Sequence, residues 1–343
     1  MKYTGQKICS LISRSIDSML KKVVRKKTIT ALFIVIVALV SCERQKEEKT
    51  PPVSKEQAPP VAAEILPGFL VSTEELAELS GQQNVVIIDA RDAEEYIKLH
   101  IPGSINIPKE TFREPEDLDY KSEYGFLTLP EKAAEVFGNA GIDDDTRVII
   151  YGTNAFPNAT IPFVILRQFG HDNVQVMQGE IEKWMKEKRP LTDKIPDVKP
   201  KKFNVKPRPE MVATMDWVMD NAEEIIVIDM RSFEEYTGFN TAGNFRGGHV
   251  SGAFPVEWKE LAGKTTVKSP EDMIEALKSN GVPLDKNKEY VTYCNWGIGR
   301  GTSGFMYLKM LGFKNVRVYG GSMEEWSDDL DFPVSTYEVG ILE

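Results

Sequence analysis

Cysteine is scarce in this chain of 343 residues, which also has only three histidines. The cysteines are Cys9, Cys42 and Cys294. Three cysteines so far apart do not form a disulfide framework, and neither residue type occurs in a metal-ligand spacing such as CxxC or HExxH. The sequence therefore predicts no metal site and no fold that depends on disulfides.

Basic residues are also in short supply over most of the chain. Residues 1–41 hold eight of the 42 Lys and Arg residues but one of the 52 Asp and Glu residues. The chain beyond residue 41 therefore has 34 basic and 51 acidic residues, a net charge of −17. This charge argues against nucleic acid as a partner, so an anionic substrate would have to be attracted locally.

The longest apolar run, Thr30–Val40, has 11 residues and is too short for a comfortable membrane span. Basic residues precede it and Leu39-Val40-Ser41-Cys42 ends it, a pattern that resembles the lipobox of bacterial lipoproteins. We expect residues 1–41 to be a signal peptide and Cys42 to carry lipid. The protein would then be exported and anchored on the periplasmic or cell-surface side of a bacterial membrane. The alternative is an uncleaved signal anchor with an incidental cysteine.

Two further expectations concern this leader region. Met19 would start a signal of more typical length than Met1 does, so both are candidate starts. Residues 42–65 are charged and contain prolines, which predicts a flexible or extended tether. With Cys9 removed and Cys42 lipidated, Cys294 would be the only free thiol.

The rest of the chain contains one unit twice. The segment VVIIDAR at 85–91 is repeated as IIVIDMR at 225–231, which is 140 residues later. His100 and His249 then pair 149 residues apart, so the second copy has nine extra residues near Thr237–Gly247. A duplicated unit predicts two similar domains.

Each unit alternates strand and helix signals. Continuous apolar runs such as VVIID and IIVID indicate strands buried on both faces. Helical patterns begin at cap-like or proline positions, for example at Ser72, Pro130 and Pro270. This alternation predicts an α/β fold, with parallel sheets covered by helices on both faces. The expected spans are 66–193 for the first domain, 194–209 for a proline- and lysine-rich linker and 210–343 for the second domain.

Only the second copy has a candidate nucleophile. The strand-like run Tyr290–Tyr293 leads into Cys294, and a glycine-rich turn carrying Arg300 leads on to a helical pattern. The first N–H groups of a helix lack internal acceptors and favour a thiolate over a thiol. Arg300 adds a fork-shaped cation suited to an oxyanion. We therefore predict that Cys294 is catalytic and not merely a small buried apolar residue.

Four motifs of the second copy together carry a family resemblance, and the first two of them also occur in the first copy: D-x-R, E-E-Y, G-H-x-x-G-A and Y-C-x-x-G. Residues 66–335 resemble the tandem-domain rhodaneses, which are sulfurtransferases. The resemblance implies an inactive first domain, in which Gly152 stands where Cys294 stands in the second. It also implies that Cys294 takes sulfane sulfur from thiosulfate or 3-mercaptopyruvate as a persulfide. A thiophilic acceptor then removes the sulfur, and no metal or organic cofactor takes part.

We expect the loop after Cys294 and two arginines to form the substrate pocket. The predicted substrate-binding residues are Asn295, Trp296, Gly297, Ile298, Gly299, Arg300 and Arg246. Trp296 is expected at the rim. Arg246 is included because the family often places a substrate-binding arginine near this point, and the other interpretation is an ordinary surface arginine. The aspartates and arginines of the D-x-R motifs are expected to support the fold.

The loop departs from the family pattern in length. Gly299 stands at the fifth position after the cysteine and Arg300 at the sixth, which makes the motif C-x5-R. This spacing resembles the loop of cysteine phosphatases and arsenate reductases, because a longer ring of N–H donors suits a tetrahedral oxyanion. Tyr293 precedes the cysteine where many phosphatases have histidine. Sulfur transfer is the main prediction; oxyanion chemistry and a non-catalytic sulfur-binding module are the alternatives.

Overall fold

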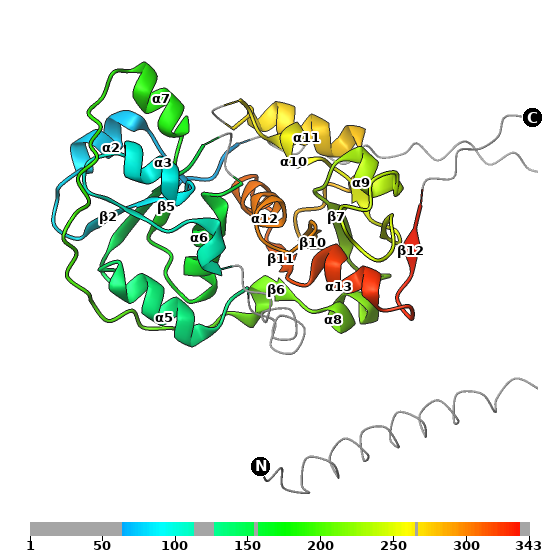
Figure 1. Cartoon of the computed structure of the whole chain (residues 1–343). Helices are drawn as coiled ribbons and strands as arrows, with labels where there is room; N and C mark the ends of the chain where they lie inside the picture. The colour runs from blue at the N-terminus through cyan, green and yellow to red at the C-terminus, as the bar shows by residue number, and fades with distance from the viewer. Residues whose placement is uncertain (1–63, 113–126, 154–156, 265–266, 337–343) are drawn as a thin grey trace, which may run out of the picture. The chain divides into compact units, whose positions relative to one another are not determined.

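The computed structural model describes residues 64–112, 127–153, 157–264 and 267–336 (Figure 1). The predicted signal peptide, the lipidation site Cys42 and all but the last two residues of the predicted tether lie outside these ranges. Within the described ranges, none of the helices has the length and apolar character that crossing a membrane requires.

The first domain is built on five parallel strands in the order β1-β5-β4-β2-β3. The strands are β1 (Leu70–Val71), β2 (Val85–Asp89), β3 (Ser104–Asn106), β4 (Arg147–Tyr151) and β5 (Val174–Met177). The helices are α2 (Thr73–Leu79), α3 (Ala93–Lys98), η1 (Lys109–Phe112), α5 (Pro130–Asn139), α6 (Thr160–Gln168) and α7 (Glu180–Lys186). The expected helix starts at Ser72 and Pro130 are confirmed, since Ser72 caps α2 and Pro130 is the first residue of α5.

The second domain repeats this sheet in the order β6-β11-β10-β7-β9, again with parallel neighbours. Its strands are β6 (Val212–Ala213), β7 (Ile226–Asp229), β9 (Phe254–Pro255), β10 (Glu289–Tyr293) and β11 (Asn315–Tyr319), with a separate antiparallel pair of β8 (His249–Val250) and β12 (Val334–Ser335). Its helices are η2 (Pro209–Met211), α8 (Met215–Asp220), α9 (Phe233–Thr237), α10 (Trp258–Leu261), α11 (Pro270–Ser279), α12 (Arg300–Met310) and α13 (Ser322–Asp328).

Both faces of each sheet are covered, as the apolar runs predicted. In the first domain, Ile87 and Ile149 pack with α2 and α7 on one face, while Ile88 and Ile150 belong to a cluster on the other face with α5 and α6. The second domain does the same with α8 and α13 on one face and α10, α11 and α12 on the other. The α/β fold of two helix-covered parallel sheets is therefore confirmed.

The largest apolar cluster runs through both domains. Helices α6 and α12 pack against each other at the centre of it (Figure 1). The helical pattern expected after Cys294 is α12, which buries polar and small residues as well as apolar ones. Gly304 shows how tightly it sits, since a Cβ there would lie 2.8 Å from Met230 Sδ. The helix is buried all round because it lies between its own sheet and the neighbouring domain.

The linker at 194–209 is held along the first domain by its own backbone. The Lys201 N–H donates to the Gly138 carbonyl at 2.9 Å, and the Lys206 N–H donates to the Phe169 carbonyl at 2.9 Å. Phe203 packs into the main cluster with 5% of its surface exposed. The linker therefore follows a defined path to the second domain.

Candidate functional site

Cys294 lies directly after β10, a central strand with β11 on one side and β7 on the other. Its N–H donates to Ser322 Oγ at 3.1 Å, and its carbonyl accepts from the Met323 N–H at 3.2 Å. The start of α13 thus holds the cysteine backbone from both sides. The carboxyl ends of parallel strands are where open α/β sheets bind ligands, so this is the expected place for a reactive side chain.

A cavity of about 380 Å³ opens beside Cys294, and both domains line it. The second domain contributes Ala242, Cys294, Asn295, Trp296, Ile298, Gly299 and Arg300. The first domain contributes Lys109, Pro157, Asn158 and Ile161. Six of the eight residues predicted for the catalytic site are therefore together around one interdomain cavity, and Gly297 and Arg246 are not part of its lining.

Gly297 lies against the end of β11 and determines the path of the loop. Its φ is +77°, and a Cβ at this position would stand 2.0 Å from the Gly320 carbonyl oxygen at the end of β11. Only glycine can adopt this conformation at so close an approach. The residue therefore sets the path of the loop, while its neighbours face the cavity.

The sulfur of Cys294 faces a carbonyl group. Its thiol donates to the Ile298 carbonyl oxygen at 3.4 Å, and only 2% of the residue is exposed. We predicted that loop N–H groups would surround the sulfur, whereas here a carbonyl oxygen faces it. This contact suits a thiol, because a thiolate has no hydrogen to donate and is repelled by a carbonyl dipole. The N–H groups of Arg300 and Gly301 begin α12 and have no intrahelical acceptor.

Arg300 is held beside the cavity by a buried carboxylate. Its Nη1 and Nη2 donate to the two oxygens of Glu235 at 2.5 and 2.9 Å. Burial by itself would raise the pKa of Glu235, but the hydrogen bonds and charge of Arg300 hold that pKa below its usual value. Two of the five N–H donors of Arg300 are used in this pair, so three remain for a ligand. The pair orients the arginine and balances much of its charge.

Lys109 is a cavity residue that sequence reasoning missed. It begins η1 in the first domain, and its side chain is 37% exposed. Its ion pairs among the described residues are long, 3.8 Å to Asp92 and 3.5 Å to Glu110, and both acids are exposed. Lys109 is thus less neutralised than Arg300. No motif marks it, although it lies shortly after β3 and so near the carboxyl edge of a sheet.

Arg246 does not face the cavity. Its guanidinium donates at 2.5 to 3.0 Å to four backbone carbonyls around the end of α13, those of Trp326, Ser327, Asp329 and Phe332. Carbonyls at a helix C-terminus lack internal donors, which explains this role. The nine-residue insertion near the active loop instead meets it through Asn244, whose Nδ2 donates to Asn295 Oδ1 at 2.6 Å.

The D-x-R motif of the second domain supports the strand that carries Cys294. Asp229 accepts from Arg231 Nη2 at 2.6 Å and from the Tyr293 hydroxyl at 2.6 Å. All three side chains are buried. Burial raises the pKa of Tyr293, and the negative charge of Asp229 adds to the effect, so the hydroxyl stays a donor. Tyr293, the residue before Cys294, is thus held in place by a buried hydrogen-bond network.

The corresponding point in the first domain has a different chemistry. Gly152 stands in the position of Cys294, and Glu180 stands in the position of Ser322, since both pairs are 142 residues apart. Glu180 is fully buried, and a Cβ on Gly152 would meet its Oε2 at 3.8 Å. A carboxylate so close would oppose a neighbouring thiolate. Residues 154–156 of this loop lie outside the described part of the chain.

Comparison with known proteins gives consistent matches. The rhodanese-like domain family matches residues 72–187 and 214–329, which lie inside the two predicted domain spans. Sulfur carrier protein TtuD of Thermus thermophilus is 30% identical over 288 residues, covering 79% of this chain and 98% of TtuD. Thiosulfate sulfurtransferase of Corynebacterium glutamicum is 25% identical over 286 residues, covering 79% and 92%. The structure of SseA from Escherichia coli has the same fold, with a TM-score of 0.65, 24% identity and coverage of 73% and 97%.

Proposed function

Because the chain belongs to the rhodanese family and has two rhodanese-like domains in tandem, we propose that it is a sulfurtransferase that works through a persulfide on Cys294. One observation carries the proposal. The only free thiol in the described residues lies at the end of β10, beside a cavity that also holds two cations. Such a site can bind an anionic donor next to a nucleophilic sulfur.

The reaction begins with the Cys294 thiolate attacking the outer sulfur of the donor. For thiosulfate the S–S bond breaks and sulfite leaves with the electron pair. For 3-mercaptopyruvate the C–S bond breaks, and the pyruvate enolate that leaves takes up a proton. A thiolate or cyanide then attacks the outer sulfur of the persulfide, which frees the product and restores the Cys294 thiolate.

Two side chains from different domains would hold the charged part of the donor. Lys109 offers an ammonium group from the first domain, and Arg300 offers its three remaining N–H donors from the second. Because Ile298 turns its carbonyl toward the sulfur, the peptide between Ile298 and Gly299 must rotate before the loop can accept an anionic persulfide. Gly299 makes that rotation feasible, since it already has a φ of +90° and a Cβ there would meet nothing within 4 Å.

The direct test is mass spectrometry of the purified protein after treatment with thiosulfate or 3-mercaptopyruvate. We expect a gain of one sulfur on Cys294 that is lost when cyanide is added, together with release of thiocyanate. A phosphate-release assay on the same sample tests the alternative suggested by the C-x5-R spacing. Phosphate release that depends on Cys294, without any gain of sulfur, would replace sulfur transfer by oxyanion chemistry.

A second candidate is a sulfur carrier, and the likeness to TtuD favours it specifically. A carrier would accept one sulfur on Cys294 from a partner protein and pass it on without rapid turnover of small donors. Steady-state thiocyanate formation separates the two functions: many turnovers per chain indicate an enzyme, whereas a single sulfur delivered per chain indicates a carrier.

We also propose that the mature protein is attached to a bacterial membrane through lipid on Cys42 and faces the exported side. The support is the lipobox-like Leu39–Cys42 that follows an apolar run of signal length. Cell fractionation tests this proposal, because Cys42→Ser should move the protein from the membrane to the soluble fraction. Wild-type protein that is already soluble and carries no lipid by mass spectrometry would contradict it.

A further inference from the structure

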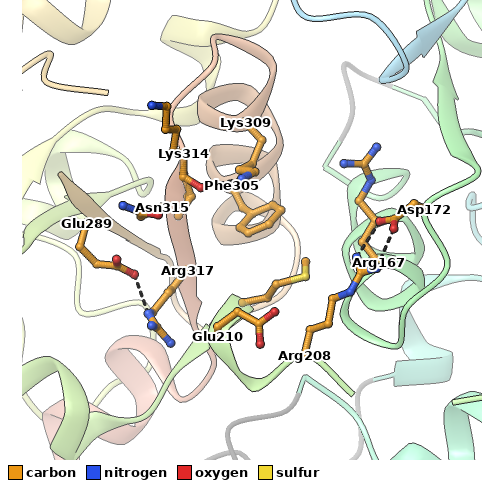
Figure 2. Close-up of a pocket in the computed structure, with 12 residues that line it drawn as sticks. Arg167, Asp172, Arg208, Glu210, Glu289, Phe305, Lys309, Lys314, Asn315 and Arg317 are labelled. Atoms are coloured by element: carbon orange, nitrogen blue, oxygen red, sulfur yellow. Dashed lines mark hydrogen bonds and ion pairs between the residues drawn. The ribbon is translucent and has the colours of Figure 1, made fainter. Parts of the chain in front are cut away.

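A second cavity lies at the other end of the two central helices. Its volume is about 440 Å³, and both domains and the end of the linker line it (Figure 2). Lys309 of α12 lines this cavity, whereas Arg300 of the same helix lines the other one. The two residues are nine positions apart, which is roughly 13 Å along a helix. The cavity is therefore separate from the one that holds Cys294.

The duplication of the domain explains which residues meet here. Thr160 and Thr302 are equivalent positions, 142 residues apart, and their hydroxyls lie 2.9 Å from each other at the start of α6 and α12. Arg167 and Lys309 are also equivalent positions 142 residues apart, near the ends of the same helices. Since the copies meet symmetrically at these helices, two cations approach one cavity from its two sides, as Figure 2 shows.

The acids that line the cavity are engaged with other cations. Arg208 makes a bidentate pair with Asp172 at 2.6 Å for each bond, and Arg317 donates to Glu289 at 2.6 Å. The third acid, Glu210, acts electrostatically on Arg208. In the described residues, neither of the two facing cations has an ion pair with a carboxylate.

Among the described residues, the hydrogen-bond and ring partners of Arg167 and Lys309 are all uncharged. The Arg167 guanidinium lies over the rings of Phe69 and Phe163 at 4.4 and 4.6 Å, and its Nε has no hydrogen-bond partner in the described part of the chain. Lys309 Nζ donates to the Lys314 carbonyl at 2.8 Å. Burial lowers the pKa of both groups, although the charge of Asp172 acts in the opposite direction on Arg167 and that of Glu289 on Lys309. The charge of Arg167 further lowers the pKa of Lys309. Each cation would therefore be stabilised by an anion in the cavity.

A helix dipole alone does not account for this arrangement. Cations in the last turn of a helix are favourable, which explains one basic residue at the end of α6 and one at the end of α12. That effect is also available to side chains that extend into water. It does not explain why both cations are partly buried on the walls of the same cavity, with no ion pair to a carboxylate in the described part of the chain.

We propose that this cavity binds a small oxyanion of the phosphate or sulfate class, held between Arg167 and Lys309. Phe305 and Met211 also line the cavity, so a phosphate ester with a compact apolar body is compatible with it. Because the two cations come from different domains, the bound anion would link the domains at the end opposite to Cys294. The proposal does not depend on the chemistry at Cys294.

Titration calorimetry on the purified protein tests the proposal, with inorganic phosphate and glycerol 3-phosphate as probes and chloride keeping the ionic strength constant. We expect saturable binding that weakens about tenfold in Arg167→Met and in Lys309→Met, because each variant loses one charged partner. Lys309→Arg should bind within about threefold of wild type. Lys278→Met is the matched control, since Lys278 is 69% exposed and distant from this lining.

The two probes also identify the source of the oxyanion. Tighter binding of glycerol 3-phosphate would indicate an ester, and equal binding would indicate an inorganic anion. Melting curves of each variant verify that it is folded. If a methionine variant does not fold, the charge-retaining Lys309→Arg is used in its place. No saturable heat from either probe would overturn the proposal, as would affinities unchanged in both methionine variants, which would locate any binding elsewhere, for instance at the Cys294 loop.

Discussion

The two domains share one buried hydrogen-bond network of aspartate, arginine and tyrosine. They differ in the residues that follow the strand that this network supports. In the first, Asp89 accepts from Arg91 Nη2 at 2.7 Å and from the Tyr151 hydroxyl at 2.6 Å. In the second, the equivalent contacts of Asp229 are both 2.6 Å. The network therefore belongs to the fold, because it is kept in a copy that has glycine where the other has Cys294.

The copies differ in chemistry at two positions around the loop. Cys294 and Ser322 in one domain are replaced by Gly152 and Glu180 in the other. The first domain is still part of the site, since it supplies Lys109 and three further residues to the cavity beside Cys294. One copy thus carries the cysteine, while the other forms a wall of the same cavity.

The largest expected effect comes from exchanging the nucleophile. Cys294→Ser should reduce sulfur transfer by more than about a thousandfold, because a serine hydroxyl does not form a persulfide. The melting temperature should change little. The reciprocal variant Gly152→Cys should form no stable persulfide in the first domain, since the buried Glu180 opposes a thiolate there. Thiocyanate formation measures the first variant, and mass spectrometry after thiosulfate measures the second. A persulfide on the introduced thiol would show that the first domain lacks only a cysteine.

The next effect is on stability. Asp229→Asn and Asp89→Asn should each lower the free energy of unfolding by about 3–5 kcal/mol, because each leaves a buried arginine without its charged partner. Urea denaturation measures this loss. Only Asp229→Asn should also lower kcat at temperatures where the protein is folded, since Asp229 fixes the residue before Cys294. Equal kcat values in the two variants would contradict this asymmetry.

A smaller effect tests the contribution of the first domain to binding. Lys109→Met should raise KM for the anionic donor about tenfold with little change in kcat, because one charged contact is lost. Lys109→Arg should restore most of the affinity. Lys98→Met, on the exposed side of α3, is the control. Steady-state kinetics with thiosulfate decide the point, and an unchanged KM would leave Arg300 as the only cation that binds the donor.

The smallest effect is a pH dependence that comes from one position at which the domains differ. Burial lowers the pKa of His171, whose equivalent in the second domain is the buried Phe313. The unfolded chain therefore binds more protons below about pH 6.5, so this group stabilises the fold above that pH and the benefit is lost as pH falls. The slope is at most roughly 1.4 kcal/mol per pH unit. Unfolding in urea between pH 7.5 and 5.5 should show a shallower slope in His171→Phe than in wild type.

Much of the fold was predictable because its signals are local. The runs at 85–91 and 225–231 have the composition of buried strands, and the structure has β2 and β7 there. The caps and prolines at Ser72 and Pro130 also placed helix starts correctly, since capping depends on neighbours in the chain. The burial of nearly every residue of α12 was not predictable, because it depends on a helix that lies about 140 residues away in the sequence.

The candidate site was predictable only in part. Cys294 and most of its loop were found, since a strand, a cysteine and a glycine-rich turn are adjacent in sequence. Arg246 was expected at the substrate, but its guanidinium is occupied by carbonyls at the end of α13. Lys109 was missed because it comes close to Cys294 only when the domains pack.

The sequence by itself determined the two α/β units, the position of Cys294 after a strand and the glycine that replaces it in the first copy. These features depend on residue type and on short spacings, which can be seen directly in the amino-acid sequence. Only the tertiary structure decided which cations face a cavity, which are neutralised, and which carbonyl meets the sulfur. Charge pairing and desolvation act through space, so Arg300 with Glu235 and Lys309 opposite Arg167 are products of packing.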